Sequence, residues 1–191
     1  IIEAGGEPLA FDRGITDYHH PETSLMGMAS RHNLVYPVSP DGRIIRQPRD
    51  SAGGKLTSSV RTDDILLACS DNRDAWETGV FSENYRRLFS PLPNLILIDD
   101  ELTMPHPAGV HFRINTSLPV SARESEAEVQ GQRYHLRVVP MNWIPATTHT
   151  GTDGVDSHLE LTNIIEFRAD PADTHRFITL LEIYPADSES V

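Results

Sequence analysis

The stretch Phe177-Ile178-Thr179-Leu180-Leu181-Glu182-Ile183-Tyr184 is the most informative part of the chain about its fold class. It is rich in β-branched and aromatic residues, it has the length of a strand, and Pro185 ends it. Tyr134-His135-Leu136-Arg137-Val138-Val139 is a second such run, in which apolar and polar residues alternate. Alternation of this kind is typical of a strand with one buried face. Both stretches therefore predict β-strands.

Shorter apolar runs occupy residues 33–36, 43–46, 65–69, 94–98 and 164–167, and 14 prolines and 12 glycines separate the runs of the chain. This spacing predicts an all-β, antiparallel sandwich with little helix.

Three further segments have weaker patterns. A helix could start at 171–181, with Asp170 as N-cap and Pro171 at the first position, although the end of this stretch, from Ile178, fits a strand better. Residues 121–131 are polar and acidic, which fits a solvated connection or an exposed hairpin, and 145–158 have the composition of a long loop.

Composition excludes several classes of function. With 16 basic and 28 acidic residues in 191, the net charge is −12, which disfavours a nucleic-acid or anionic-membrane binder because phosphates need clustered cations. No apolar run reaches the roughly 18 residues of a membrane span. Cys69 is the single cysteine, which excludes an internal disulfide framework and a multi-thiolate metal site. The chain opens at Ile1 without methionine, so we expect a removed leader or the C-terminal part of a longer protein.

Three motifs in order carry a resemblance to a known family. They are Gly5-Gly6-Glu7-Pro8-Leu9-Ala10-Phe11-Asp12-Arg13-Gly14, then Ser30-Arg31-His32-Asn33-Leu34-Val35-Tyr36 with Asp41-Gly42, then Tyr85-Arg86-Arg87-Leu88-Phe89 with Asn94–Leu102 and His111–Ile114. Together they resemble the C-terminal β-sandwich half of the heparinase II/III-like polysaccharide lyases, over about residues 1–118. Leu34 stands where that family usually has threonine.

The resemblance implies a domain plan and an activity. It implies a core sandwich of the lyase supersandwich type over 1–120, with 121–191 as further strands of it or a small C-terminal β subdomain, and no N-terminal α-helical toroid in this chain. The family cleaves uronic-acid polysaccharides, of heparan/heparin or alginate type, by β-elimination. Its base and acid lie mainly on the toroid, so no catalytic pair is assigned here, and we expect the chain alone to be inactive. The implied location is periplasmic or secreted.

Asp12 and His32 are the candidate metal ligands. A carboxylate and an imidazole on adjacent strands suit Zn²⁺, although a turn-forming aspartate and a structural histidine explain the same residues. The resemblance implies that both bind a structural zinc, with the third protein ligand upstream of Ile1.

Tyr18, Arg31 and Asn33 are the candidate substrate-binding residues. Tyr18 offers a proton donor or a stacking surface for a sugar ring, and Arg31 a fork for a substrate carboxylate. A solvent loop and a surface salt bridge explain them equally, and Asn33 fits a role in holding His32. Trp76 and Trp143 suit either a sugar platform or the core. The alternative function is a non-catalytic β-sandwich that binds carbohydrate or protein.

Overall fold

The computed structural model describes residues 1–12, 21, 28–48, 53–63, 65–123, 125–155 and 160–188. These residues form short 3-10 helices and antiparallel strands, which confirms the predicted all-β class. The elements are β1 (Ile2–Ala4), β2 (Glu7–Ala10), η1 (Ala29–Arg31), β3 (Val35–Val38), β4 (Lys55–Arg61), β5 (Leu66–Asp71), η2 (Arg73–Ala75), β6 (Glu83–Leu92), β7 (Leu95–Thr116), β8 (Val120–Arg123), β9 (Glu126–Gln130), β10 (Tyr134–Pro140), β11 (Thr147–Val155) and β12 (Leu161–Pro185).

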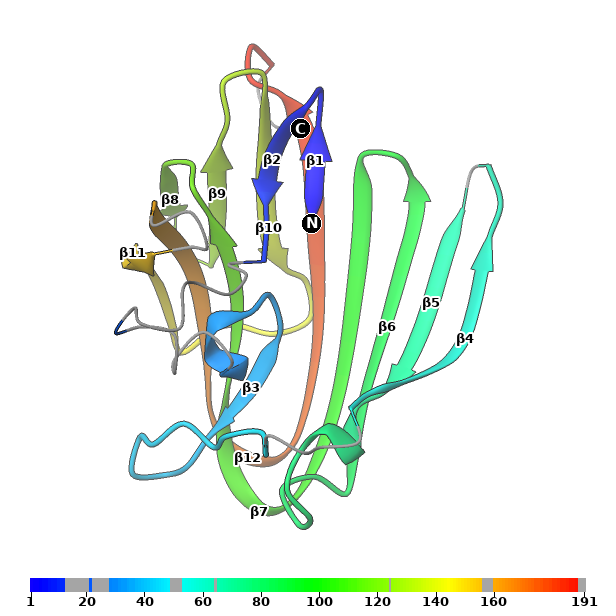
Figure 1. The fold of residues 1–191 in the computed structure, drawn as a ribbon, viewed down its shortest axis with the longest axis vertical. Helices are drawn as coiled ribbons and strands as arrows, with labels where there is room; N and C mark the ends of the chain where they lie inside the picture. The colour runs from blue at the N-terminus through cyan, green and yellow to red at the C-terminus, as the bar shows by residue number, and fades with distance from the viewer. Residues whose placement is uncertain are drawn as a thin grey trace.

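Ten of the strands belong to one antiparallel sheet, and β1 and β2 form a separate hairpin. The main path of the sheet is β4-β5-β6-β7-β12-β10-β9-β8, while β3 pairs with β7 and β11 pairs with β12. The two long strands β7 and β12 lie side by side at its centre (Figure 1). No helix among the described residues is long and apolar enough to cross a membrane.

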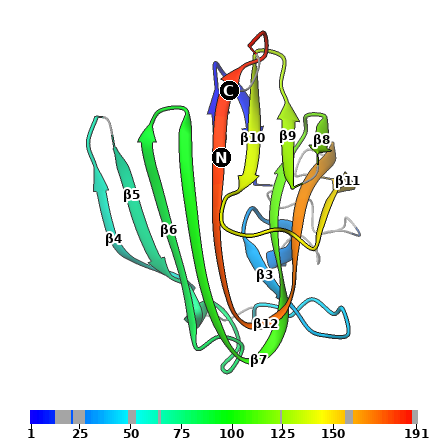
Figure 2. The same cartoon turned by 180° about the vertical axis from the view of Figure 1, so that it is seen from behind.

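Bends in β7 and β12 fold this sheet into two layers. The register between them shifts around Ala172, close to Pro171 of β12 and opposite the Pro105–Gly109 stretch of β7. Proline cannot donate to the ladder, and a bulge bends its strand, so both strands turn here (Figures 1 and 2). The first half of β7 pairs with β6, and its second half pairs with β3.

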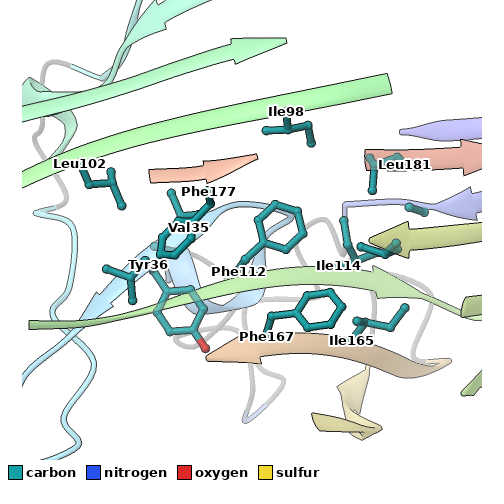
Figure 3. Packing of buried hydrophobic residues seen from close by; sticks show 14 of the residues in the cluster. Val35, Tyr36, Ile98, Leu102, Phe112, Ile114, Ile165, Phe167, Phe177 and Leu181 are labelled. Atoms are coloured by element: carbon teal, nitrogen blue, oxygen red, sulfur yellow. The ribbon is translucent and has the colours of Figure 1, made fainter. Parts of the chain in front are cut away.

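The hydrophobic core lies between the two layers. Phe112 and Phe167 come from one layer, and Phe177 from the other (Figure 3). Trp143 connects them, because its ring centroid lies 4.4 Å from that of Phe177 and 6.0 Å from that of Phe167. Fully buried aliphatic side chains complete the core, including Leu9, Leu102, Val129, Leu136, Val138, Ile165 and Leu181.

The β1–β2 hairpin turns on Gly5 and Gly6, which have φ angles of 58° and 83°. Two consecutive positive φ angles favour glycine and match the tight turn that suits twisted strands. The Glu7 carboxylate accepts hydrogen bonds from the backbone N–H of Gln132, which fixes the hairpin to the turn before β10. After β2, Phe11 N–H donates to the Asn115 carbonyl at 3.1 Å. The chain therefore reaches Asp12 beside the end of β7.

Two segments differ from their sequence-based predictions. Residues 171–181 lie within β12 and are not helical, because pairing with β7 and β10 outweighs the local Asp-Pro capping signal. Residues 147–155 form strand β11 rather than part of a long loop, since one edge of β12 is open to pair with them. The run 43–46 contributes a single bridge, from Ile44 to Val38. The 121–131 segment contains the β8–β9 hairpin, as one of the two predicted readings had it.

Candidate functional site

Asp12 and His32 lie in contact. Asp12 follows β2, and His32 follows η1, where its N–H donates to the Ala29 carbonyl at 3.1 Å. The Asp12 Oδ2 and His32 Nδ1 atoms are 2.7 Å apart. Their side chains are 54% and 29% exposed, so the pair is open to solvent. Two residues that are separated by a long stretch of chain thus present a carboxylate oxygen and an imidazole nitrogen at one point.

Asn33 holds the two segments of this pair together. Its amide nitrogen donates to the Phe11 carbonyl at 3.2 Å, next to Asp12 in the chain. Its amide oxygen accepts from the backbone and side-chain nitrogens of Asn115, at 2.7 and 2.8 Å. Asn115 is fully buried and also donates to the Arg31 carbonyl. These bonds fix the backbone on both sides of the Asp12–His32 contact.

A cavity of about 470 Å³ lies directly behind the pair. Asp12 and His32 line it from one side, and Asn84, Arg86 and Asp100 line it from the sheet. Arg86 donates to both oxygens of Asp100, at 2.6 and 2.9 Å, and donates to the Asn33 carbonyl at 3.3 Å. The sheet is therefore linked to the His32 segment through Arg86.

The Arg86–Asp100 pair is a buried ion pair. Asp100 is 1% exposed, and it lies between Ile98 and Leu102 on the inward-facing side of β7. Burial opposes the charge of Arg86, but the Asp100 carboxylate outweighs it and raises the pKa of the guanidinium above its ordinary value. Both residues belong to the third sequence motif, although neither was predicted as a site residue. The sequence signal that could have identified the pair is Asp100, an acidic residue at an inward-facing position of an apolar strand.

Arg31 lines a different cavity, of about 540 Å³, on the outer face of the layer that contains β3 and β11. It forms an ion pair with Asp153, which also accepts from Arg113 at 2.5 Å. Burial raises the pKa of the Asp153 carboxyl, but the two guanidinium groups outweigh this and hold it below its ordinary value. Arg31 and His32 are neighbours in sequence but line separate cavities. Tyr18 lies outside the described residues.

Glu166 is a buried carboxylate that lines this second cavity. It accepts hydrogen bonds from Tyr36 Oη at 2.5 Å and Arg168 Nε at 2.8 Å, and His111 Nδ1 lies 3.4 Å away. Burial alone would raise the pKa of Glu166, but these partners outweigh it and lower the pKa to about 2. Burial and the neighbouring Glu166 raise the pKa of Tyr36 instead. The carboxylate is ionised and Tyr36 is neutral at physiological pH.

Metal binding at Asp12 and His32 requires the pair to open slightly. Tetrahedral zinc with ligand bonds of about 2.0–2.1 Å places its ligand atoms roughly 3.3 Å apart, against 2.7 Å here. The donor types fit zinc, and both groups are accessible. Among the described residues no group of three or more His, Cys, Asp or Glu side chains is arranged to hold a metal ion. The pair offers one carboxylate oxygen and one imidazole nitrogen at a single point, and zinc binding there stays a prediction.

The two tryptophans pack with aromatic partners. Trp76 is buried, with its ring edge-on to Phe81 at 5.4 Å between centroids. Trp143 lies against Phe167 and Phe177. These contacts match the core interpretation of Trp143, whereas Trp76 also lines the cavity of about 470 Å³.

The fold is shared with part of a class of polysaccharide lyases. Solved structures that it matches include heparan sulfate lyase HepC from Pedobacter heparinus, at 10% identity and a TM-score of 0.71, over 94% of this chain and 29% of that chain. They also include the BT4657 gene product described as heparinase III, at 12% identity and a TM-score of 0.71, over 91% of this chain and 27% of that chain. Another heparinase III matches at 15% identity and a TM-score of 0.65, over 93% of this chain and 28% of that chain. The chain spans less than a third of the length of these lyases. No protein-family model and no curated protein matches the sequence.

Proposed function

We propose that this chain is the β-sandwich part of a polysaccharide lyase that cleaves a uronic-acid polysaccharide by β-elimination. The supporting observation is the Asp12–His32 contact at the mouth of a polar cavity, in a fold that heparan sulfate lyases share. Those relatives favour a heparan-type over an alginate-type substrate. We place the protein outside the cytoplasm, in the periplasm or secreted, because such a polymer is accessible there.

In this proposal, Asp12 and His32 bind a structural zinc, and a residue upstream of Ile1 is the third protein ligand. Zinc would fix the segment after β2 against the segment after η1, which Asn33 already holds by hydrogen bonds. The zinc would hold the substrate cleft in shape. The residues that line the cavity behind the pair form one wall of that cleft. The base and acid come from a helical domain of the same enzyme.

Zinc content of the purified intact gene product tests the metal site. After dialysis against zinc-free buffer, we expect bound zinc in the wild type and a loss of at least tenfold in affinity in Asp12→Ala and in His32→Ala, because each removes one ligand. His106→Ala is the matched control, since His106 is exposed and lies between two prolines of β7. Equal zinc in all four proteins would contradict the assignment.

The same variants separate the lyase from a non-catalytic binding module. A module that binds carbohydrate or protein without zinc keeps its binding in Asp12→Ala. A lyase part whose cleft is fixed by zinc loses saccharide binding together with the metal.

A further inference from the structure

The cavity behind Asp12 and His32 has a polar wall where a sandwich interior is usually apolar. Asn84 and Arg86 project from β6, and Asp100 from β7, onto the inward face that Ile98 and Leu102 share. Buried polar groups reduce stability unless they are hydrogen-bonded. Arg86 and Asp100 satisfy one another, and Arg86 also donates to Asn33. Asn84 is in a different situation.

Asn84 is 3% exposed, and it lines the cavity. Its backbone carbonyl accepts from Asn72 N–H at 2.7 Å, but its side-chain amide makes no hydrogen bond with any residue that the structure describes. A carboxamide offers two donor hydrogens and an acceptor oxygen. An almost wholly buried carboxamide that faces a cavity without a protein partner is available to a ligand.

The charges of the cavity limit what that ligand can present. Of the described side chains that line it, Arg86 is the one permanent cation, and the Asp100 carboxylate neutralises it. Asp12 adds a second carboxylate at the mouth, beside His32. Among the described side chains at this wall, a carboxylate or sulfate group on the ligand would meet no unpaired permanent cation. Hydroxyl groups both donate and accept, and they match the carboxamides of Asn84 and Asn72.

We propose that this cavity is a subsite for the uncharged, hydroxyl-bearing part of one sugar ring, which hydrogen-bonds to the Asn84 carboxamide. The volume of about 470 Å³ falls within the range of small-ligand pockets and accommodates a pyranose. The acidic substituents of the polymer then lie outside the cavity. This inference rests on the proposed function, and it adds that this part of the substrate is recognised through hydroxyl groups rather than through charge.

Calorimetric titration of the 191-residue chain with a saccharide tests the subsite. The probe is an unsulfated tetrasaccharide of alternating glucuronate and N-acetylglucosamine. We expect Asn84→Ala to weaken binding about three- to tenfold, the usual effect of losing a neutral hydrogen bond, and Asn94→Ala in the exposed β6–β7 turn to leave it unchanged. Raising NaCl from about 50 to 500 mM should change the affinity less than about threefold, since the subsite does not use charge.

Thermal unfolding distinguishes lost contact from lost structure. Because the Asn84 amide has no partner in the described structure, Asn84→Ala should keep or raise the unfolding midpoint. Asn84→Asp, which keeps the size but loses both donors, is the second variant and should also weaken binding.

Unchanged affinity in both Asn84 variants, or loss of binding at high salt, would overturn the subsite but leave the proposed function standing. Failure of the wild-type chain to bind the tetrasaccharide would overturn the subsite alone, and failure of the intact gene product to bind heparan sulfate polymer would overturn both.

Discussion

Replacing Asp100 with asparagine removes the charge that neutralises Arg86 on the inward face of the sheet. Asp100 is 1% exposed and accepts two hydrogen bonds from Arg86, whose side chain is 22% exposed towards the cavity. Asparagine keeps the size of the side chain but leaves the guanidinium without a counter-charge. Arg86 also donates to the Asn33 carbonyl, so we expect the perturbation to reach the His32 segment.

The magnitude follows from the burial of the pair. Removing one partner of a buried ion pair costs about 3–5 kcal/mol, and the partial exposure of Arg86 places this case near about 3 kcal/mol. For a domain of this size, that loss corresponds to a fall of roughly 6–12 °C in the unfolding midpoint. Asp100→Leu combined with Arg86→Met removes both charges and should lose less than Asp100→Asn alone.

Urea unfolding followed by circular dichroism measures these differences. The control is Asp74→Asn, which breaks the exposed pair of Asp74 with Lys55 and should leave the midpoint nearly unchanged. Equal stability of Asp100→Asn and the wild type, or a double variant that is less stable than the single one, would refute the buried-pair reasoning.

Three other substitutions test the rest of the structure. The pKa of Glu166 is about 2, below its ordinary value of 4.5, so the ionised group contributes stability above pH 4.5 that is lost as pH falls towards 2. Over this pH range, acid titration should lower the stability of the wild type by about 3 kcal/mol more than that of Glu166→Gln, in which the other carboxylates still titrate. Phe112→Ala should cost about 3–5 kcal/mol in urea unfolding, and Phe89→Ala, at a 37% exposed position, much less. In Gly5→Ala, a Cβ would lie 2.7 Å from a ring carbon of Tyr134 at φ 58°, so calorimetry should show a lower midpoint than for Gly6→Ala, whose added Cβ meets nothing within 4 Å; equal midpoints would contradict this.

The all-β class could be predicted because the decisive strands carry their own pattern. The run 134–139 alternates, and 177–184 is strongly apolar; the two pair with each other in the sheet. The side chains of these strands that face the core are buried, and the order of apolar and polar residues along each strand reflects that burial directly.

The middle of β12 and the segment of β11, whose conformation depends on distant pairing, were not predicted as strands. Asp170-Pro171 has the local signature of a helix start, yet it lies in β12 at its bend, where the long ladder with β7 decides the conformation. The Thr- and Gly-rich segment of β11 has little strand pattern, and it is a strand because it pairs along β12.

In the candidate site, too, some residues could be predicted from the sequence and others could not. Asp12, His32 and Asn33 were singled out through motifs, and the structure brings all three together. Arg31 faces the other cavity, because its side chain leaves the chain on the opposite side from that of His32. Asn84 has no sequence signal, since a lone asparagine in a strand acquires meaning only when its neighbours in space are known.

Formation of unsaturated product from heparan sulfate, followed by ultraviolet absorbance, tests the central claim most directly. The intact gene product that contains this chain should generate the product, Asp12→Ala should lower its rate together with its zinc content, and the 191-residue chain alone should generate none. Absence of product from the intact, zinc-loaded protein with both heparan-type and alginate-type polymers would contradict the lyase assignment.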